Sequence, residues 1–297
     1  LKRAEHTVFC VSDGQKYYYD AQFNRRIPFS SGQQVKRSIL DSISEVLNVL
    51  PSPTTFLFDV TKQKELKEGE VYGTCDPTYP DQLLGGWMKA AKGGKDRTLK
   101  RRSPLSISAM RGLHPLLSGL DSDNASFDRS DRQNNQVIVR DEKGNQLSEE
   151  EIVSFLEGKD RSLSRKWIPN QSRASGLFVS DIAIDLRRLF TVSLNSFEPE
   201  MSDETIGKLK SEGWIQSKNI FGECLVAPKA IREEWAKALG KSIVNWKITS
   251  NQSRTFSLMD TLALSISNNA NLIAGSIRAK LSEEDSNKAQ AIIDESL

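Results

Sequence analysis

Histidine and cysteine are scarce in this chain, which carries two histidines and three cysteines among 297 residues. None of them stands at the spacing of a zinc ligand set, which argues against a metal site. The cysteines lie far apart, so we expect them to be the reduced thiols of a cytoplasmic protein. No apolar run approaches the roughly 20 residues of a membrane-spanning helix, and the polar start lacks the features of a signal peptide.

Motifs of enzymes are scarce as well. The paired glycines lack the strand–turn–helix setting of a nucleotide-binding loop. Asp181 and Asp185 could be read as a catalytic carboxylate pair, yet Arg187 and Arg188 follow Asp185 and favour a structural ion pair. His114 has no evident nucleophile or orienting partner, so a structural role is expected for it. We therefore expect a protein without catalysis and without a cofactor.

The residues that are present have an ordinary globular composition, 37% hydrophobic and 27% charged. The order of strand-like and helix-like segments predicts an α+β fold with an antiparallel sheet in a ferredoxin-like arrangement. Residues 1–74 and 176–297 are expected to form this core. Residues 75–175 are rich in polar residues and glycine and predict a functional insertion, partly mobile, because compact domains rarely hold so long an irregular connection.

Apolar spacing locates the individual elements. Residues 7–12 and 16–23 flank an Asp-Gly turn, which predicts a hairpin. A helix is expected from Ser31 to about Leu50, because apolar residues recur there every three or four positions. The remaining predicted elements are strands over 55–60, 177–184, 191–197 and 243–248, and helices over 201–212, 228–239 and 255–281.

The net charge of +2 hides an uneven distribution. Positions 25 to 37 hold four basic residues and no acidic one, and positions 92 to 111 hold seven basic residues against Asp96 alone. Basic stretches on a nearly neutral chain suit a polyanion that is bound along a groove. The alternative for each stretch is a solvated charged face.

The first basic stretch contains the predicted start of a helix. Backbone N–H groups at a helix start are unpaired and attract anions, and Gly32 would let a phosphate approach the backbone closely. Hydroxyl, amide and cationic side chains there suit contacts to phosphate and ribose. The alternative is a capped surface helix. The candidate contacts are Arg25, Arg26, Ser31, Gln33, Lys36 and Arg37.

Two further segments are candidates for the same role. Residues 100–111 place three consecutive cations before a run of alternating character, in which Met110 could wedge between base steps. Residues 250–255 are polar and cationic and precede the last predicted helix. The alternatives are a structural strand with a basic flank and an ordinary capping turn. The candidate contacts in these segments are Arg101, Arg102, Met110, Arg111, Asn251, Gln252 and Arg254.

The residues at the first helix start resemble a known family. Their pattern Ser-x-Gln-x-x-Lys-Arg resembles the start of the first core helix in the backbone subunits of CRISPR Cascade complexes, the DevR/CasC-like superfamily, although Leu40 stands where many members have a further basic residue. Three later segments resemble that family in the same order: the Arg-Arg-Ser-Pro-Leu-x-Ile-Ser run within 101–115, the aspartate-containing strand and Asp-Leu-Arg-Arg within 177–193, and the closing helix over 251–280.

The resemblance implies a crRNA-binding protein of a type I effector, a ribonucleoprotein complex of antiviral defence. It implies an RRM-like palm in residues 1–74 and 176–297, with a thumb and a finger-like lobe in 75–175. It further implies a helical filament of copies along the crRNA, with a large subunit, a subunit that caps the crRNA 5′ end, and target DNA as partners. Such a protein holds the RNA backbone and leaves sequence recognition to base pairing.

Two other functions remain open at this stage. A type III-like backbone subunit would cut target RNA with a metal ion and a thumb aspartate, for which the candidates are Asp121, Asp123, Asp128 and Asp131. A transcription regulator would need a recognition helix with base-reading residues. The helix from Ser31 has few such residues beyond Arg37, which argues against a regulator.

Overall fold

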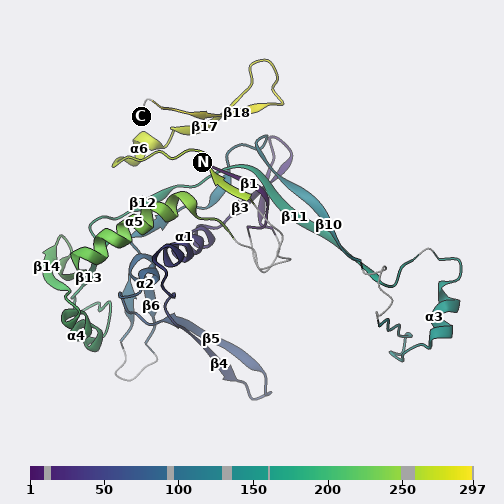
Figure 1. The fold of residues 1–297 in the computed structure, drawn as a ribbon, viewed down its shortest axis with the longest axis horizontal. Helices are drawn as coiled ribbons and strands as arrows, with labels where there is room; N and C mark the ends of the chain where they lie inside the picture. The colour runs from purple at the N-terminus through teal and green to yellow at the C-terminus, as the bar shows by residue number, and fades with distance from the viewer. Residues whose placement is uncertain (10–14, 92–96, 129–135, 160, 249–257, 296–297) are drawn as a thin grey trace. The chain divides into compact units, whose positions relative to one another are not determined.

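The computed structural model describes the chain except residues 10–14, 92–96, 129–135, 160, 249–257 and 296–297. It is an α+β protein with antiparallel sheets, as the sequence predicts (Figure 1). The chain divides into two compact units, one of Leu1–Leu120 with Ala174–Leu297 and one of Asp121–Arg173.

The largest sheet has seven strands and brings together segments from the whole length of the chain. Its strand order is β16-β1-β11-β9-β3-β2, and β10 pairs with β11 outside this path. All of the register pairs along the path are antiparallel. The strands are β1 (Lys2–Thr7), β2 (Tyr17–Asp20), β3 (Arg25–Ser30), β9 (Met110–Gly112), β10 (Ser118–Asp128), β11 (Arg165–Val179) and β16 (Leu258–Thr261).

Two helices, α1 (Gly32–Leu47) and α5 (Lys229–Asn245), connect strands of this sheet. The first connection runs from β1 through α1 to β9, and in the sheet β11 lies between β1 and β9. The second connection runs from β11 through α5 to β16, and β1 lies between β11 and β16. The helices pack against each other and enclose an apolar core with the sheet. No helix in the described part of the chain is both long and apolar enough to span a bilayer.

The first helix forms where the sequence predicts it. Its N-cap is Ser31, and its buried face includes Val35, Ile39 and Ile43. The helix ends three residues earlier than expected, because Asn48 adopts a left-handed conformation and its N–H bonds back to carbonyls of the last turn.

A second apolar cluster lies in the same unit. It involves a three-stranded sheet and includes buried Val192, Leu209, Trp214 and Trp235. The helices predicted over 201–212 and 228–239 are confirmed, but α5 continues to Asn245, so the strand predicted over 243–248 is wrong. The elements are β13 (Thr191–Ser193), α4 (Asp203–Ser211), β14 (Ile215–Asn219) and β15 (Gly222–Val226).

Two local predictions fail because strands pair with distant segments. β1 ends at Thr7 and pairs with β11 and β16, while β2 pairs with β3, so the described residues of 7–12 and 16–23 do not pair with each other as the predicted hairpin. The helix predicted over 255–281 is replaced, from Leu258 onward, by β16 and three short elements, α6 (Ala270–Ile273), β17 (Ile277–Leu281) and its partner β18 (Ala289–Ile293).

The separate unit in the middle of the chain, Asp121–Arg173, is shorter than the insertion predicted over residues 75–175. Residues 75–120 belong to the large unit because Leu83, Leu84 and Leu105 are buried in its apolar clusters. The small unit holds α3, which is capped by Ser148 and buries none of its residues. The elements of this region are α2 (Pro80–Gly85), β6 (Trp87–Lys89), β7 (Leu99–Arg101), β8 (Leu105–Ile107), β12 (Ile182–Ile184), which pairs with β8, and α3 (Glu149–Leu156).

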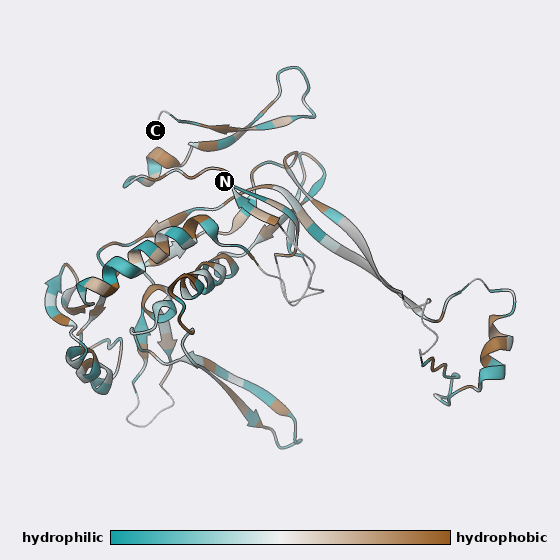
Figure 2. Ribbon diagram, viewed as in Figure 1, coloured by the Kyte–Doolittle hydropathy of each residue, from teal (hydrophilic) through white to brown (hydrophobic). Residues whose placement is uncertain are grey.

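A two-stranded ribbon follows α1 and consists of β4 (Thr54–Val60) and β5 (Leu66–Gly73). The strand predicted over 55–60 is thereby confirmed. Brown bands along the ribbon mark its hydrophobic residues (Figure 2), and five of them are more than half exposed. An isolated hairpin is only marginally stable in water, so this ribbon is suited to a partner surface. The exposed apolar residues are Phe56, Phe58, Val60, Leu66 and Val71.

A buried lysine on β1 makes the stability of the core depend on pH. The ammonium of Lys2 donates hydrogen bonds to the Trp246 carbonyl at 2.9 Å and to Thr261 Oγ1 at 2.7 Å. Burial lowers the pKa of Lys2 from 10.5 to about 8, although the charge of Asp260 opposes this shift. Between pH 8 and pH 10.5 the unfolded chain therefore binds more protons than the folded protein, so this group adds stability as the pH rises.

We expect the wild type to gain about 1–2 kcal/mol of unfolding free energy relative to Lys2→Met when the pH rises from 7 to 9.5. Urea unfolding of both proteins at the two pH values measures this difference. A difference that stays constant with pH would show that the lysine titrates at its ordinary pKa.

Candidate nucleic-acid interface

The start of α1 is the centre of the candidate site. The Ser31 hydroxyl accepts a hydrogen bond from the Gln34 N–H at 3.3 Å, and no acidic residue stands in the first turn. Gln33 in that turn is exposed. The positive end of the helix dipole is therefore not neutralised by a carboxylate of its own first turn, which favours an approaching anion.

The role expected for Gly32 is corrected by the structure. A Cβ atom at this position would lie 2.4 Å from the Ile107 carbonyl oxygen and 3.1 Å from the Ser108 carbonyl carbon. The close approach that glycine permits is therefore to the end of β8, and it seats the helix start on that strand. A phosphate does not need to fit there.

Lys36 lies one turn into the helix and is half-buried. Burial lowers the pKa of its ammonium, because the surrounding protein replaces part of its hydration. No carboxylate among the described residues lies within ion-pair distance of it. A phosphate is a favourable partner for this ammonium, because its negative charge would compensate for the hydration that the ammonium loses on burial.

Arg37, next to Lys36, is already engaged. Its Nε lies 2.9 Å from a carboxylate oxygen of Asp41, one turn further along the helix, and both side chains are largely exposed. Such a surface pair contributes about 0.3–0.5 kcal/mol to stability. The pair can open at low cost, so Arg37 is available to an anion but less readily than Lys36.

Strand pairing brings Arg111 to the same place. Arg111 on β9 stands opposite Phe29 on β3, two residues before the helix cap. Its guanidinium lies 3.0 Å from a carboxylate oxygen of Asp181, whose backbone N–H donates a hydrogen bond to Ser108 Oγ at 2.8 Å. The Arg111–Asp181 pair is exposed. It sets the position of the arginine beside the helix start.

Sequence reasoning did not assign Ser108 and Asp181 to this site. Neither could be found from local composition, because β9 and the segment after β11 meet only through sheet pairing. Among the candidates, Ser31, Gln33 and Lys36 thus share the start of α1, and strand pairing places the backbone of Arg111 opposite Phe29, two residues before the helix cap. We call Ser31, Gln33, Lys36, Arg37, Ser108 and Arg111 the α1 surface.

Arg25 and Arg26 are exposed at the far end of β3. Arg26 lies over the ring of Tyr17 at 4.9 Å, and an Arg25 guanidinium nitrogen contacts the Pro115 carbonyl at 3.5 Å. β2 adds three consecutive tyrosines that are 41–59% exposed. Burial raises the pKa of Tyr18 and nearby Asp20 adds to this, while Arg111 is close enough to oppose it. This edge joins cations with aromatic rings, the combination that binds unpaired nucleotides.

The second basic segment is corrected in two places. Arg101 is buried, and its guanidinium lies 3.1 Å from Glu200 and donates to the Leu83 and Arg188 carbonyls. Met110 is fully buried in the core with α1. Neither side chain can reach a nucleic acid in this structure, so we withdraw both as contacts. Arg102 beside them is exposed.

The third candidate segment, residues 250–255, is outside the part of the chain that the structure describes. Asn251, Gln252 and Arg254 lie outside the described residues. The structure offers one observation on the four thumb aspartates: Asp121 is exposed. Of the other three, Asp131 lies outside the described residues and nothing is described of the side chains of Asp123 and Asp128.

The residues that were weighed for catalysis have structural partners. Arg187 Nε lies 2.7 Å from Asp185, and this hydrogen bond lowers the pKa of the carboxyl, which confirms the expected ion pair. His114 Nδ1 accepts the Leu116 N–H at 3.1 Å and its ring packs edge-on against Phe23. In the part of the chain that the structure describes, no three His, Cys, Asp or Glu side chains are grouped as a metal site.

The comparisons with known proteins leave the family open. No protein-family model matches the chain, and no curated protein matches it.

Proposed function

We propose that this chain is a crRNA-binding backbone subunit of a CRISPR Cascade-type effector, which polymerises along the guide RNA without catalysing a reaction. The observation that carries the proposal is the α1 surface. It combines a helix start without first-turn acids, a half-buried Lys36 with no ion-pair partner among the described residues, and Arg111 on the neighbouring strand. These groups suit contacts to phosphate, which position a strand without reading its sequence.

The topology of the sheet supports an RRM-like palm. Two strand–helix–strand units are interlocked in the order β16-β1-β11-β9, and each unit encloses a strand of the other. This is the split arrangement of ferredoxin-like folds. On this proposal β3 and β2 extend the palm beyond β9, and the small unit of Asp121–Arg173 is an insertion into it.

The exposed ribbon supports assembly. One face of β4–β5 presents Phe56, Phe58 and Val60 to solvent, next to Val71 and Leu66 of the opposite strand. A soluble monomer rarely leaves such a row uncovered, and an interface is its usual explanation. We propose that this ribbon is the thumb-like element, which the sequence had placed in residues 75–175. The further partners proposed are the large subunit, the crRNA 5′-end-capping subunit and target DNA, in the cytoplasm.

The proposal predicts binding of single-stranded RNA that is independent of base sequence and steeply dependent on salt. Uridine and cytidine homopolymers of equal length should bind within about threefold of each other, because phosphate contacts carry no sequence information. The logarithm of the binding constant should fall by about 0.7 for each contacted phosphate per tenfold rise in salt. Filter binding from 50 to 300 mM salt measures both quantities.

The matching test is purification of the chain from its native host. We expect bound RNA of uniform length that carries one invariant repeat. A preparation free of RNA, together with no filter retention of either homopolymer at 50 mM salt, would contradict the proposal.

A further inference from the structure

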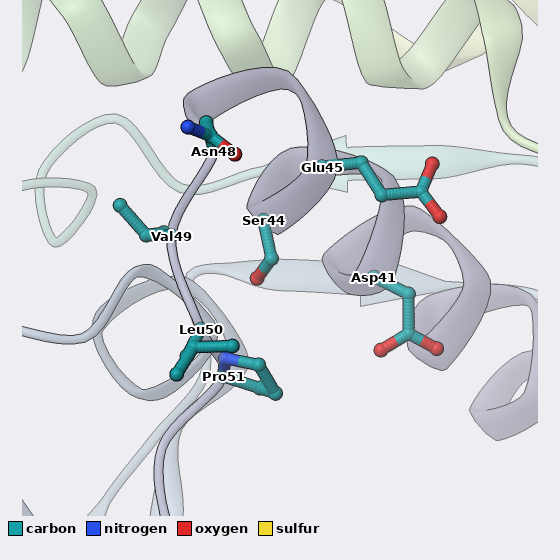
Figure 3. Close-up of a pocket in the computed structure, with 7 residues that line it drawn as sticks. All are labelled: Asp41, Ser44, Glu45, Asn48, Val49, Leu50 and Pro51. Carbon is teal, nitrogen blue, oxygen red and sulfur yellow. The ribbon is translucent and has the colours of Figure 1, made fainter.

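A hollow at the C-terminal end of α1 meets the proposed RNA site only through the Arg37–Asp41 ion pair. Its volume is about 480 Å³ (Figure 3). It lies at the opposite end of the helix from Ser31, so a group bound there does not compete with a phosphate at the helix start. We call it the α1 socket. Its lining residues are Asp41, Ser44, Glu45, Asn48, Val49, Leu50 and Pro51.

The socket is suited to a positive charge. Glu45 places on its wall a carboxylate without an ion-pair partner among the described residues, Asp41 adds a second carboxylate that is paired with Arg37, and the last turn of α1 holds no basic residue. The negative end of the helix dipole adds to their potential. Ser44 is 6% exposed, and its hydroxyl has no hydrogen-bond partner among the described residues. Figure 3 shows this hydroxyl directed to the same side as Asp41, above Leu50 and Pro51. A donor that enters the socket would satisfy it.

The rim of the socket is apolar. Leu50 is 84% exposed and Val49 is 42% exposed, and Pro51 lies beside them. An apolar rim around carboxylates fits an amphipathic cation, whose alkyl stem contacts the rim while its charged head reaches the acids. The side chain of lysine has this construction.

The tip of the β4–β5 ribbon carries such lysines. Val60 and Leu66 face each other at its end and are 71% and 72% exposed. The turn between them holds Lys62, Lys64 and one acidic residue, Glu65, so it is net basic. Lys64 has a left-handed conformation, and its N–H donates to the Thr61 carbonyl at 2.9 Å. Neither lysine pairs with a carboxylate of the described residues. The tip therefore offers cations flanked by apolar side chains, which complements the socket in charge and polarity.

The ribbon cannot reach the socket of its own molecule. β4 starts at Thr54, three residues after the socket ends at Pro51, and its seven residues carry the tip about 24 Å away. The occupant must come from another molecule. A contact in which the tip of one copy meets the socket of the next is heterologous, and repetition of such a contact produces an open filament.

We propose that the α1 socket receives Lys62 or Lys64 from the ribbon of a second copy of this chain. The inference rests on the proposed function in one respect, because RNA is the template that brings successive copies together. It assigns one surface of the contact between copies to the C-terminal end of α1 and the other surface to the tip of the β4–β5 ribbon. The phosphate site and the contact between copies thereby occupy the two ends of one helix.

Charge reversal at the socket tests this contact. Mass photometry of the protein on a 60-nucleotide RNA measures how many copies bind. Glu45→Lys should weaken assembly by about tenfold or more, because it places a cation opposite the incoming lysine. The triple variant Glu45→Lys, Lys62→Glu, Lys64→Glu should restore assembly. The matched control Glu198→Lys changes an exposed glutamate far along the chain and should assemble like the wild type.

A disulfide trap tests the same contact without RNA. A chain with Glu45→Cys is mixed with a chain with Lys64→Cys at high concentration under mild oxidation. Both chains also carry Cys10→Ser, because Cys10 lies outside the described residues, whereas Cys75 and Cys224 are buried. The two thiols lose two electrons and two protons to the added oxidant, which leaves one disulfide. We expect a covalent heterodimer from this mixture and none when Glu198→Cys replaces Glu45→Cys.

The outcomes separate the two proposals. Normal assembly of Glu45→Lys on RNA, with no disulfide in the trap, would overturn the socket and leave RNA binding standing. A disulfide between the two variants in the trap, together with no RNA binding by the wild-type chain, would overturn the proposed function and leave the socket standing.

Discussion

Replacing Arg101 by methionine is expected to lower the free energy of unfolding by about 3–5 kcal/mol. The Arg101 and Glu200 side chains are 1% and 7% exposed and lie 3.1 Å apart. Arg101 also donates to the Leu83 carbonyl at 3.2 Å and to the Arg188 carbonyl at 2.9 Å, and its guanidinium lies over the Trp87 ring. Methionine fills most of the space but leaves the Glu200 carboxylate and two carbonyls without these donors, and that desolvated charge causes most of the loss.

Urea unfolding followed by tryptophan fluorescence measures this effect. The neighbouring Arg102 is exposed, so Arg102→Met should change stability by less than about 0.5 kcal/mol and serves as the control. The double variant Arg101→Met, Glu200→Met should be more stable than Arg101→Met alone, because it removes the uncompensated charge. An Arg101→Met protein that keeps wild-type stability but loses RNA affinity would return Arg101 to the interface.

Arg101 also shows what local sequence cannot resolve. Three consecutive cations, Lys100, Arg101 and Arg102, look alike in composition, and only the middle one is buried. Its partner Glu200 lies 99 residues away, and the two meet only because β7 and the chain before α4 come together in the fold. The burial of one cation in a basic run depends on such a long-range partner.

The elements set by local chemistry were predictable. α1 has a serine cap, apolar residues at helical spacing and a stop near Pro51, and all three signals agree. The helix predicted over 255–281 failed although its apolar spacing was similar. Leu258 to Thr261 pair along β1, and Asn268 and Asn269 interrupt the pattern, so tertiary pairing outweighs a weak helical period.

The candidate site was predictable in part for the same reason. Ser31, Gln33 and Lys36 are neighbours on one helix, so their proximity follows from the sequence alone. Arg111 was chosen for its charge, yet its place beside the helix start follows from pairing with β3, which no local pattern encodes. Gly32 was noticed correctly as a point of close approach, but the approaching group is the β8 backbone.

The double variant Lys36→Ala, Arg37→Ala is expected to bind single-stranded RNA about 25-fold more weakly at 0.1 M salt and about fivefold more weakly at 0.3 M salt. Each phosphate contact contributes about 0.7 to the salt slope, so the loss of two contacts reduces the slope by about 1.4. Lys36→Ala alone should account for the larger share, because Arg37 must first give up its pair with Asp41. Filter binding over this salt range measures the affinities and the slope.

The fold should survive this change, since neither side chain belongs to the apolar core and the Arg37–Asp41 pair is exposed. The matched control is Lys237→Ala, Lys241→Ala, which removes the same charge from α5 beside Val46 and Leu47, at the other end of α1. If binding depended only on net charge, both double variants would lose affinity equally. If binding depends on the helix start, the control variant keeps the salt slope of the wild type and the α1 variant has a reduced one. The reason is that, of the two cation pairs, only the α1 cations lie within one turn of the N–H groups that are proposed to hold the phosphate.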